Sequence, residues 1–273
     1  YNETNMADAY ALGSNFNESV VNDFKNLSST TGIETQFVVK SIADLEDEPT
    51  VTLHFLEKNN ISRYYPVEGE KINFSDADGI WLDARFAEAK NLTVGDNISV
   101  KFNGITLNKT IRGLGYSPDY VYEQPENGLV SDFKYQGFGY LSDKAYPGEN
   151  MPHNKLLMTS NANTSDYYHQ TRAMLEDKGY DDIINGTSFM PREDSSSDNQ
   201  IQDEIKQHIV LAVMFPIIFV VVALLILLTT MTRIVNQQRT QIGTLKAIGF
   251  EDKPLIIHYL SYGFYLTLIG SVL

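Results

Sequence analysis

Residues 209–231 form an apolar run of 23 positions without a charged side chain, and Arg233 follows almost at once. An α-helix rises about 1.5 Å per residue, so a helix over this run is about 35 Å long, while the hydrocarbon core of a bilayer is about 30 Å thick. The run therefore predicts a transmembrane helix, bounded at residues 208–232. The alternative is a fully buried helix of a soluble protein, for which so long an uncharged stretch is unusual.

The charges on either side of this run predict its orientation. Residues 233–254 carry four Lys and Arg against two Asp and Glu, whereas residues 1–207 carry 17 Lys and Arg against 33 Asp and Glu. Basic residues close to a span mark its cytoplasmic end, while long domains cross the membrane largely regardless of charge. We therefore predict that residues 1–207 are extracellular and that 233–254 form a cytoplasmic stalk and coupling segment. The acidic balance offers no basic face to nucleic acid.

A second apolar run, 255–273, reaches the last residue of the sequence. It predicts the start of a second transmembrane helix, which would make the chain a multi-pass protein of the cell membrane. Because the sequence begins with Tyr1 and stops inside this run, we expect a fragment of a longer chain. There is no cysteine, and an extracellular part of this size without disulfides is typical of a bacterial exterior.

Hydrophobic periodicity predicts that residues 1–207 fold as an α+β domain. We expect strands in hairpins rather than βαβ units, and Asn103-Gly104 is the strongest hairpin signal. Residues 191–200 are expected to be a polar linker that leads into the membrane helix. The predicted helices are 15–27, 84–90 and 165–177. The predicted strands are 33–43, 50–57, 79–83, 98–102, 105–113, 135–141, 155–159 and 183–189.

The sequence lacks three common motifs of catalysis and nucleotide binding. It has no Gly-x-Ser-x-Gly, no His-Glu-x-x-His and no Gly-x-x-x-x-Gly-Lys-Ser/Thr, and its five histidines are scattered. We therefore predict no catalytic, cofactor-binding or metal-ligating residues in this chain. If ATP drives it, another subunit binds the ATP and its Mg²⁺.

An aromatic segment, residues 115–147, has two interpretations. Tyrosine is a large amphipathic side chain with few rotors, so such a segment can bind a ligand or a partner. Alternatively, the same aromatics pack the core beneath a long loop. The residues of this possible surface are Tyr116, Tyr120, Tyr122, Tyr135, Phe138 and Tyr140.

The helical period of the first span continues past the bilayer, which predicts one continuous helix from His208 to Ile248. Gly243 and Gly249 are poor residues for a helix interior and offer places to bend. Pro216 removes one backbone hydrogen bond inside the span and predicts a kink near the outer leaflet. A span, a basic amphipathic stub and an immediate return span suit the docking of a cytosolic partner.

The inner segment reads TTMTRIVNQQRTQIGTLKAIGF, followed by a polar gap and IIHYLSYGFYLTLIGS. With these runs, residues 209–273 resemble the FtsX-like permeases of ABC transporters, the group that includes MacB-type and LolC-type proteins. The likeness is greatest to the long permeases of Gram-positive bacteria that carry large extracellular domains. Around Trp81-Leu82-Asp83, Phe86-Ala87 and Val94-Gly95-Asp96, the outer part is similar to the MacB-type periplasmic core domain. Many family members have Glu where this chain has Gln241. The residues that match the family pattern at the inner segment are Thr229, Thr230, Arg233, Gln238, Arg239, Ile242, Gly243, Leu245, Lys246, Ala247 and Gly249.

The resemblance implies a membrane-spanning permease subunit without ATPase activity of its own. A separate ATP-binding subunit would dock on the cytoplasmic turn, and its hydrolysis cycle would move the extracellular domain. A second permease copy, or a second half of the same chain, would complete the assembly. The residues implied in coupling are Arg233, Arg239, Gln241, Ile242, Gly243, Leu245, Lys246 and Gly249.

Three functions remain open at this point. The first is export or extraction of a hydrophobic or peptidic substrate by an ABC complex. The second is a regulatory or sensing complex, in which the extracellular domain controls a cell-wall hydrolase or detects an antimicrobial peptide without transport. The third, an ecto-enzyme on a membrane anchor, is disfavoured by the absent motifs.

Overall fold

The computed structural model of this chain describes residues 5–13, 15–122 and 132–272. The chain forms two compact units, Tyr1–Asp203 and Glu204–Leu273. The first unit is α+β, as predicted, and the second is helical. Helix α5 (Ser196–Gln237) begins in the first unit and ends in the second.

Ten strands of the first unit join one mixed sheet within the described residues. The strands are β1 (Ala9–Leu12), β2 (Thr30–Ala43), β3 (Thr50–Leu56), β4 (Tyr65–Gly69), β5 (Gly79–Asp83), β6 (Asn97–Phe102), β7 (Ile105–Tyr116), β8 (Gln136–Ser142), β9 (Lys155–Ser160) and β10 (Ser188–Pro191). The helices of this unit are α1 (Glu18–Lys25), α2 (Ala84–Ala89), α3 (Thr164–Asp177) and α4 (Asp181–Gly186), with short 3₁₀ turns η1 (Pro118–Tyr120), η2 (Asp143–Ala145) and η3 (Arg192–Asp194).

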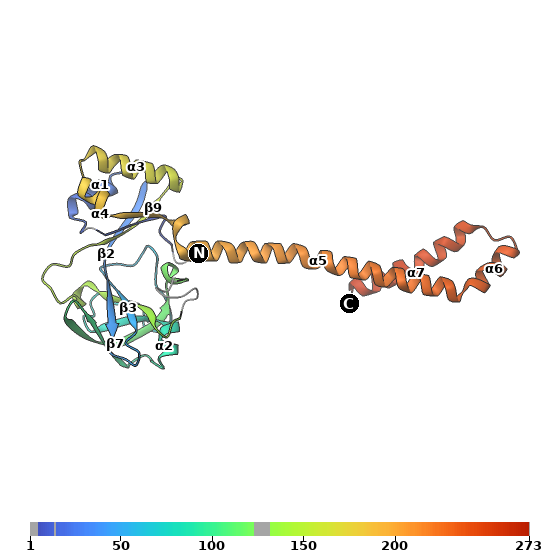
Figure 1. Cartoon of the computed structure of the whole chain (residues 1–273), viewed down its shortest axis with the longest axis horizontal. Helices are drawn as coiled ribbons and strands as arrows, with labels where there is room; N and C mark the ends of the chain where they lie inside the picture. The colour runs from blue at the N-terminus through green and yellow to red at the C-terminus, as the bar shows by residue number, and fades with distance from the viewer. Residues whose placement is uncertain (1–4, 14, 123–131, 273) are drawn as a thin grey trace. The chain divides into compact units, whose positions relative to one another are not determined.

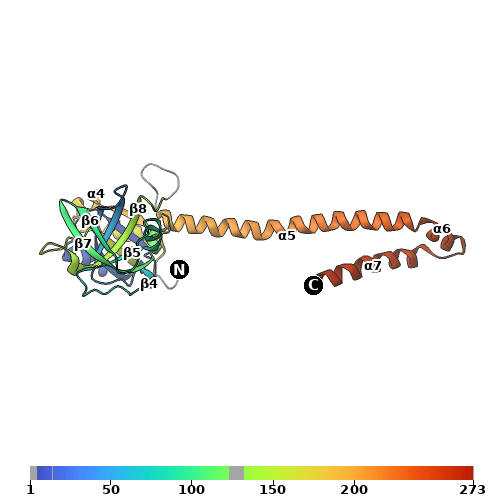
Figure 2. The same ribbon diagram turned by 90° about the horizontal axis from the view of Figure 1, so that it is seen from below.

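Part of this sheet closes into a barrel. The path β2-β3-β8-β5-β7-β6 returns to β2, because β6 pairs with both β7 and β2. Figure 2 shows β5, β6, β7 and β8 on this barrel. Strand β4 adds to β7 as an edge strand. Helix α2 contributes buried Phe86 and Ala87 to the barrel core, alongside inward residues such as Leu53 and Phe55.

The other part of the sheet, β10-β1-β9 with the first half of β2, forms a layer with the helices. Helices α1, α3 and α4 lie together at one end of this unit, and β2 runs from them into the barrel (Figure 1). Their core joins Phe16, Val20 and Phe24 to Leu156 and Met158 of β9. We call β1, β9, β10 and these three helices the helical layer.

The local chemistry explains why the predicted elements form. Asn103 and Gly104 both have positive φ, of 47° and 80°, which is the backbone of a tight hairpin turn between β6 and β7. The Asp83 side chain accepts a hydrogen bond from the backbone N–H of Arg85 and so caps the first turn of α2. The predicted hairpin and the predicted helix after GIWLD are confirmed.

Three details of the first unit differ from the predictions. Strands β5 and β7 pair in parallel, as do β3 and β8, so the sheet is not built from hairpins alone. Residues 183–189 are not one strand, because Asp181 and Asp182 occupy the first turn of α4 and the strand covers only Ser188–Pro191. Acidic residues favour a helix N-terminus, and Ile183 packs into the layer core as part of that helix. Residues 191–200 hold η3 and the start of α5 rather than a linker.

The second unit contains α6 (Arg239–Ala247) and α7 (Asp252–Val272) after α5. Among the described residues, α5 has the length and apolar composition to span a membrane. Its side chains from 209 to 226 are exposed, including Phe219 at 67%. A soluble core helix buries such side chains, so their exposure agrees with a lipid-facing segment. The second span over 255–273 remains a prediction.

Candidate coupling site

The turn between the two apolar helices begins at Gln238, where α5 ends and α6 starts. The expected continuous helix from His208 to Ile248 is wrong, because α5 stops at Gln237. The backbone N–H of Gln238 donates to Ile234 O, and the carbonyl oxygen of Gln238 accepts from the N–H of Ile242, both at 3.0 Å. Its side chain accepts a hydrogen bond from the Tyr259 hydroxyl of α7. The break therefore lies where a side chain bridges to α7, whereas Gly243 stays inside α6.

Gly249 ends α6 in a Schellman motif. Its φ is +97°, the left-handed region that favours glycine. The N–H of Gly249 donates to Lys246 O at 3.0 Å, and the N–H of Phe250 donates to Leu245 O at 3.1 Å. This pair of bonds satisfies carbonyls that the helix end would otherwise leave unpaired. The glycine predicted as a bend is thus the stop signal of α6.

An ion pair joins α6 to α7 across this stop. Lys246 Nζ lies 2.6 Å from Asp252 Oδ1, at the first residue of α7. Pro254 stands in that first turn, where its missing N–H costs no helical hydrogen bond. The negative charge of Asp252 also suits the positive end of the helix dipole. The chain therefore turns sharply and returns.

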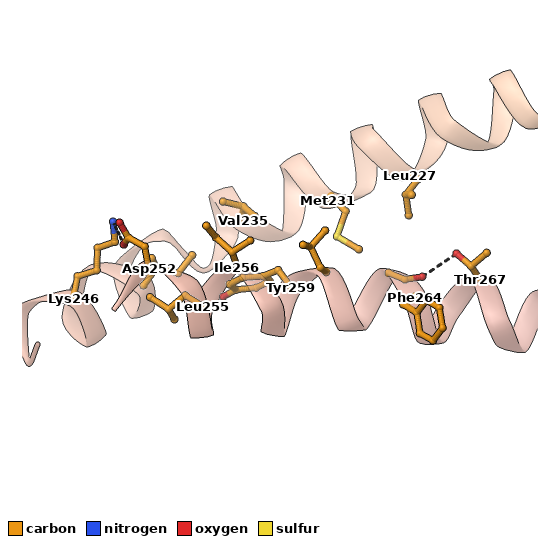
Figure 3. Close-up of a pocket in the computed structure, with 13 residues that line it drawn as sticks. Leu227, Met231, Val235, Lys246, Asp252, Leu255, Ile256, Tyr259, Phe264 and Thr267 are labelled. Carbon is orange, nitrogen blue, oxygen red and sulfur yellow. Dashed lines mark hydrogen bonds and ion pairs between the residues drawn. The ribbon is translucent and has the colours of Figure 1, made fainter. Parts of the chain in front are cut away.

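Helix α7 runs back along the end of α5. The Tyr259–Gln238 hydrogen bond comes first, and one turn later Gly263 lies against the methyl group of Met231. A groove of about 620 Å³ opens between the helices, and Leu227 and Met231 point from α5 towards α7 (Figure 3). The groove is lined by Leu227, Met231, Val235, Ile242, Lys246, Asp252, Leu255, Ile256, Tyr259, Leu260, Gly263, Phe264 and Thr267.

The predicted coupling residues divide between two faces. Ile242 and Leu245 are half-buried and Ile242 faces the groove. The polar and glycine positions of the set are exposed: Arg233, Arg239, Gln241, Gly243, Lys246 and Gly249. Arg233 lies apart from Ile242 and Lys246, in an open depression that it shares with Thr229, Thr232, Asn236 and Gln237. Helix α6 therefore has Ile242 and Lys246 on the groove side, and its exposed Arg239 and Gln241 can contact another protein.

Sequence reasoning missed three residues that shape this turn: Gln238 as a bridging side chain, Tyr259 as its donor and Asp252 as the partner of Lys246. Their spacing carries no local signal, because each contact joins α7 to another helix. Pro216 lies inside α5, which continues as one helix on both sides of it. The kink at Pro216 stays a prediction.

Some aromatic residues of segment 115–147 pack the core, and others are exposed as a binding surface would require. Phe138 and Tyr140 are fully buried, and the Tyr120 ring stacks on Phe138 with centroids 4.6 Å apart. Tyr116 and Tyr135 are 45% and 49% exposed, and Tyr122 is half-buried. Residues 123–131 of this segment lie outside the described residues. Packing therefore accounts for three of the rings, and the others are accessible.

No curated protein matches this chain. Several solved structures are similar to it, among them two extracellular or periplasmic domains. One is the extracellular domain of the noncanonic ABC-type transporter YknZ from Gram-positive bacteria, with 13% identity over 67% of this chain and 98% of that one, at a TM-score of 0.42. The other is the periplasmic region of MacB from Actinobacillus actinomycetemcomitans, with 10% identity over 73% of this chain and 92% of that one, at a TM-score of 0.41. At such low TM-scores neither likeness supports a conclusion about this chain.

The end of the chain gives the firmer assignment. Residues 213–273 match the family model described as FtsX-like permease C-terminal. The matched range contains α5 from residue 213 onward, the whole of α6 and the described residues of α7, which are the elements that build the turn. The helical end of this chain is therefore similar to the C-terminal part of the FtsX-like permeases.

Proposed function

We propose that this chain is the membrane-spanning permease subunit of an ABC transporter and has no ATPase activity of its own. The observation that carries the proposal is the exposed helix α6, which stands between two antiparallel apolar helices inside the segment that matches the permease family. A membrane protein that leaves a short basic helix uncovered at such a turn has a surface for a soluble partner. We assign α6 to the cytoplasmic side, because its flanks carry the basic residues nearest the span.

In this proposal the partner is an ATP-binding subunit whose hydrolysis cycle displaces α6. The displacement passes through α5 to the extracellular unit, where it drives export or extraction of a substrate. A second permease copy, or a second half of the same chain, would supply the symmetric half of the complex. Docking by α6 rather than by α7 is favoured because Arg239 and Gln241 are exposed, while Tyr259 is engaged with Gln238.

The test is the ATPase rate of the full permease purified with its ATP-binding subunit. Arg239→Glu and Lys246→Glu are expected to reduce the rate to that of the ATP-binding subunit alone. Lys58→Glu, an exposed charge reversal in the first unit, is the matched control and should leave the rate unchanged. A rate in both α6 variants equal to that of Lys58→Glu would contradict docking at α6.

A regulatory complex is the second candidate. The accessible Tyr116 lines an apolar depression of about 260 Å³ together with Tyr65 and Val121, which favours an extracellular binding event. Under this function a cell-wall hydrolase or an antimicrobial peptide binds the first unit while no substrate crosses. Capture of such a partner by the full chain in detergent, with no substrate movement in reconstituted vesicles, would decide for this candidate.

A further inference from the structure

Residues 117–122, which we call the strap, follow directly after β7 and contain η1. The strap is attached to the outer face of the barrel at two points. Ser117 Oγ lies 2.9 Å from the hydroxyl of Tyr140 on β8. The Tyr120 hydroxyl is hydrogen bonded to Nε2 of His54 on β3, 2.5 Å away. Both barrel partners are fully buried, so the barrel ends of these bonds are shielded from water.

The strap is also attached to the helical layer. The Asp119 carboxylate accepts a hydrogen bond from the Tyr10 hydroxyl of β1 at 2.9 Å. Its second oxygen lies 2.8 Å from Nζ of Lys155 on β9. The side chains of Lys155 and Asp119 are only 7% and 8% exposed. A charge buried to this degree is costly without an opposite charge beside it. Moving Asp119 away from the layer would therefore leave the positive charge of Lys155 buried and unpaired.

The first turn of α5 is the third attachment. Ser197 Oγ lies 2.8 Å from the carbonyl oxygen of Asp119 and 3.1 Å from that of Tyr122, and it accepts a hydrogen bond from the N–H of Tyr122 at 3.2 Å. Ser197 is 1% exposed, whereas the neighbouring Ser196 is exposed. The buried hydroxyl of Ser197 thus holds the start of α5 to the strap backbone at both Asp119 and Tyr122.

We infer that the strap distributes a displacement of the first turn of α5 to the barrel and to the helical layer at the same time. Ser197 receives the displacement, Tyr120 passes it to the barrel, and Asp119 passes it to the layer. Because the three attachments share six consecutive residues, one cannot shift far without the others. The barrel and the layer share strand β2, so an unequal pull on them changes the distance between them. This inference rests on the proposed function, which supplies the displacement.

The test measures that distance in the full permease assembled with its ATP-binding subunit. The chain has no cysteine, so Thr106→Cys on the barrel and Ala173→Cys on α3, both at exposed positions, accept spin labels selectively. The label-to-label distance is compared without nucleotide and with ATP and vanadate. We expect a nucleotide-dependent shift in the labelled parent and in Ser196→Ala. In Ser197→Ala we expect loss of the shift, with the stimulated ATPase rate retained.

Two results overturn the inference alone: the same shift in Ser197→Ala as in Ser196→Ala, or no shift in the parent while the permease still stimulates the ATPase. Absence of stimulation by any form of the permease overturns the proposed function, and the inference with it. If Ser197→Ala does not fold, Asp119→Asn combined with Lys155→Met replaces it. This pair removes the buried ion pair without leaving a lone charge, and it too should lose the shift.

Discussion

Lys246 Nζ lies 2.6 Å from Asp252 Oδ1, so an ion pair joins the two ends of the turn between α6 and α7. Their side chains are 53% and 65% exposed. An ion pair this open to solvent contributes little to stability, because water and salt screen it. The charge of Lys246 is therefore available to a partner, and its role in docking can be separated from its role in the turn.

Substitutions at the two ends of this pair should have unequal effects. Lys246→Glu reverses the charge that α6 presents and is expected to abolish stimulation of the ATPase. Asp252→Asn breaks the same pair but keeps Lys246 positive, so at least half of the stimulation should remain. The measurement is the ATPase rate of the purified complex at constant salt. Equal losses in both variants would mean that the pair itself, rather than the charge of Lys246, is required.

The two glycines of α6 should respond in opposite directions to alanine. Gly249→Ala forces a side chain into φ +97° and is expected to cost about 1–2 kcal/mol at the helix end. Gly243→Ala adds a methyl group to open space inside α6 and should stabilise the helix by about 0.5–1 kcal/mol. Amide exchange at Ile248 and Phe250 is the readout, since their N–H groups bond to the last turn of α6. Faster exchange is expected only in Gly249→Ala.

Two glycines of β8 test the barrel core. A methyl group at Gly137 would lie 2.6 Å from Cγ and 2.7 Å from Cβ of the buried Phe86, atoms at the base of the side chain rather than at its free end. Gly137→Ala is expected to cost about 1–3 kcal/mol of unfolding free energy. At Gly139 the nearest atom is the terminal methyl of Ile80, at 2.8 Å, which can rotate away, so Gly139→Ala should cost less.

The readout for these β8 variants is built into the chain. Trp81 is the single tryptophan and is fully buried in the first unit. Its fluorescence during denaturant unfolding of the full chain therefore reports the stability of the barrel. A midpoint for Gly139→Ala below that of Gly137→Ala would contradict the packing described around Phe86.

The buried His54 makes the first unit sensitive to acid. Burial holds the pKa of His54 well below its usual value, and the positive charge of Lys155 lowers it further. Gln36 and the hydroxyl of Tyr120 occupy its two ring nitrogens, and Tyr140 lies against the ring. Below about pH 6.5 the unfolded chain binds a proton at this residue that the folded chain does not.

Stability should therefore fall as the pH drops below about 6.5 towards the folded pKa, with His54 contributing up to about 1.4 kcal/mol per pH unit. His54→Gln removes the titrating group and should flatten this dependence, whatever its effect on absolute stability. His169→Gln removes an exposed histidine of α3 and should leave the slope unchanged. The measurement is the free energy of unfolding, followed by Trp81 fluorescence between pH 5 and 7. An equal pH dependence in His54→Gln and His169→Gln would contradict the role of His54.

Much of the local structure could be predicted from the residues. Strand β5 (Gly79–Asp83) begins and ends where the pattern predicts, and the Asn103-Gly104 turn is where a hairpin signal predicts it. These features depend on neighbours in the chain: alternation, a capping carboxylate or a glycine that tolerates positive φ. Ile183 shows where local prediction fails. The two adjacent isoleucines suggest a strand, but the acidic first turn of α4 and packing in the layer core favour a helix.

By itself the sequence determined that an apolar helix follows a large acidic α+β domain, since length, charge and periodicity are properties of consecutive residues. Only the tertiary structure decided that β6 closes a barrel on β2, that Tyr259 meets Gln238, and that Ser197, Asp119 and Lys155 lie on one path. Each of these contacts joins segments far apart in the chain. No local pattern encodes such contacts, because they form only when burial of the apolar faces brings those segments together.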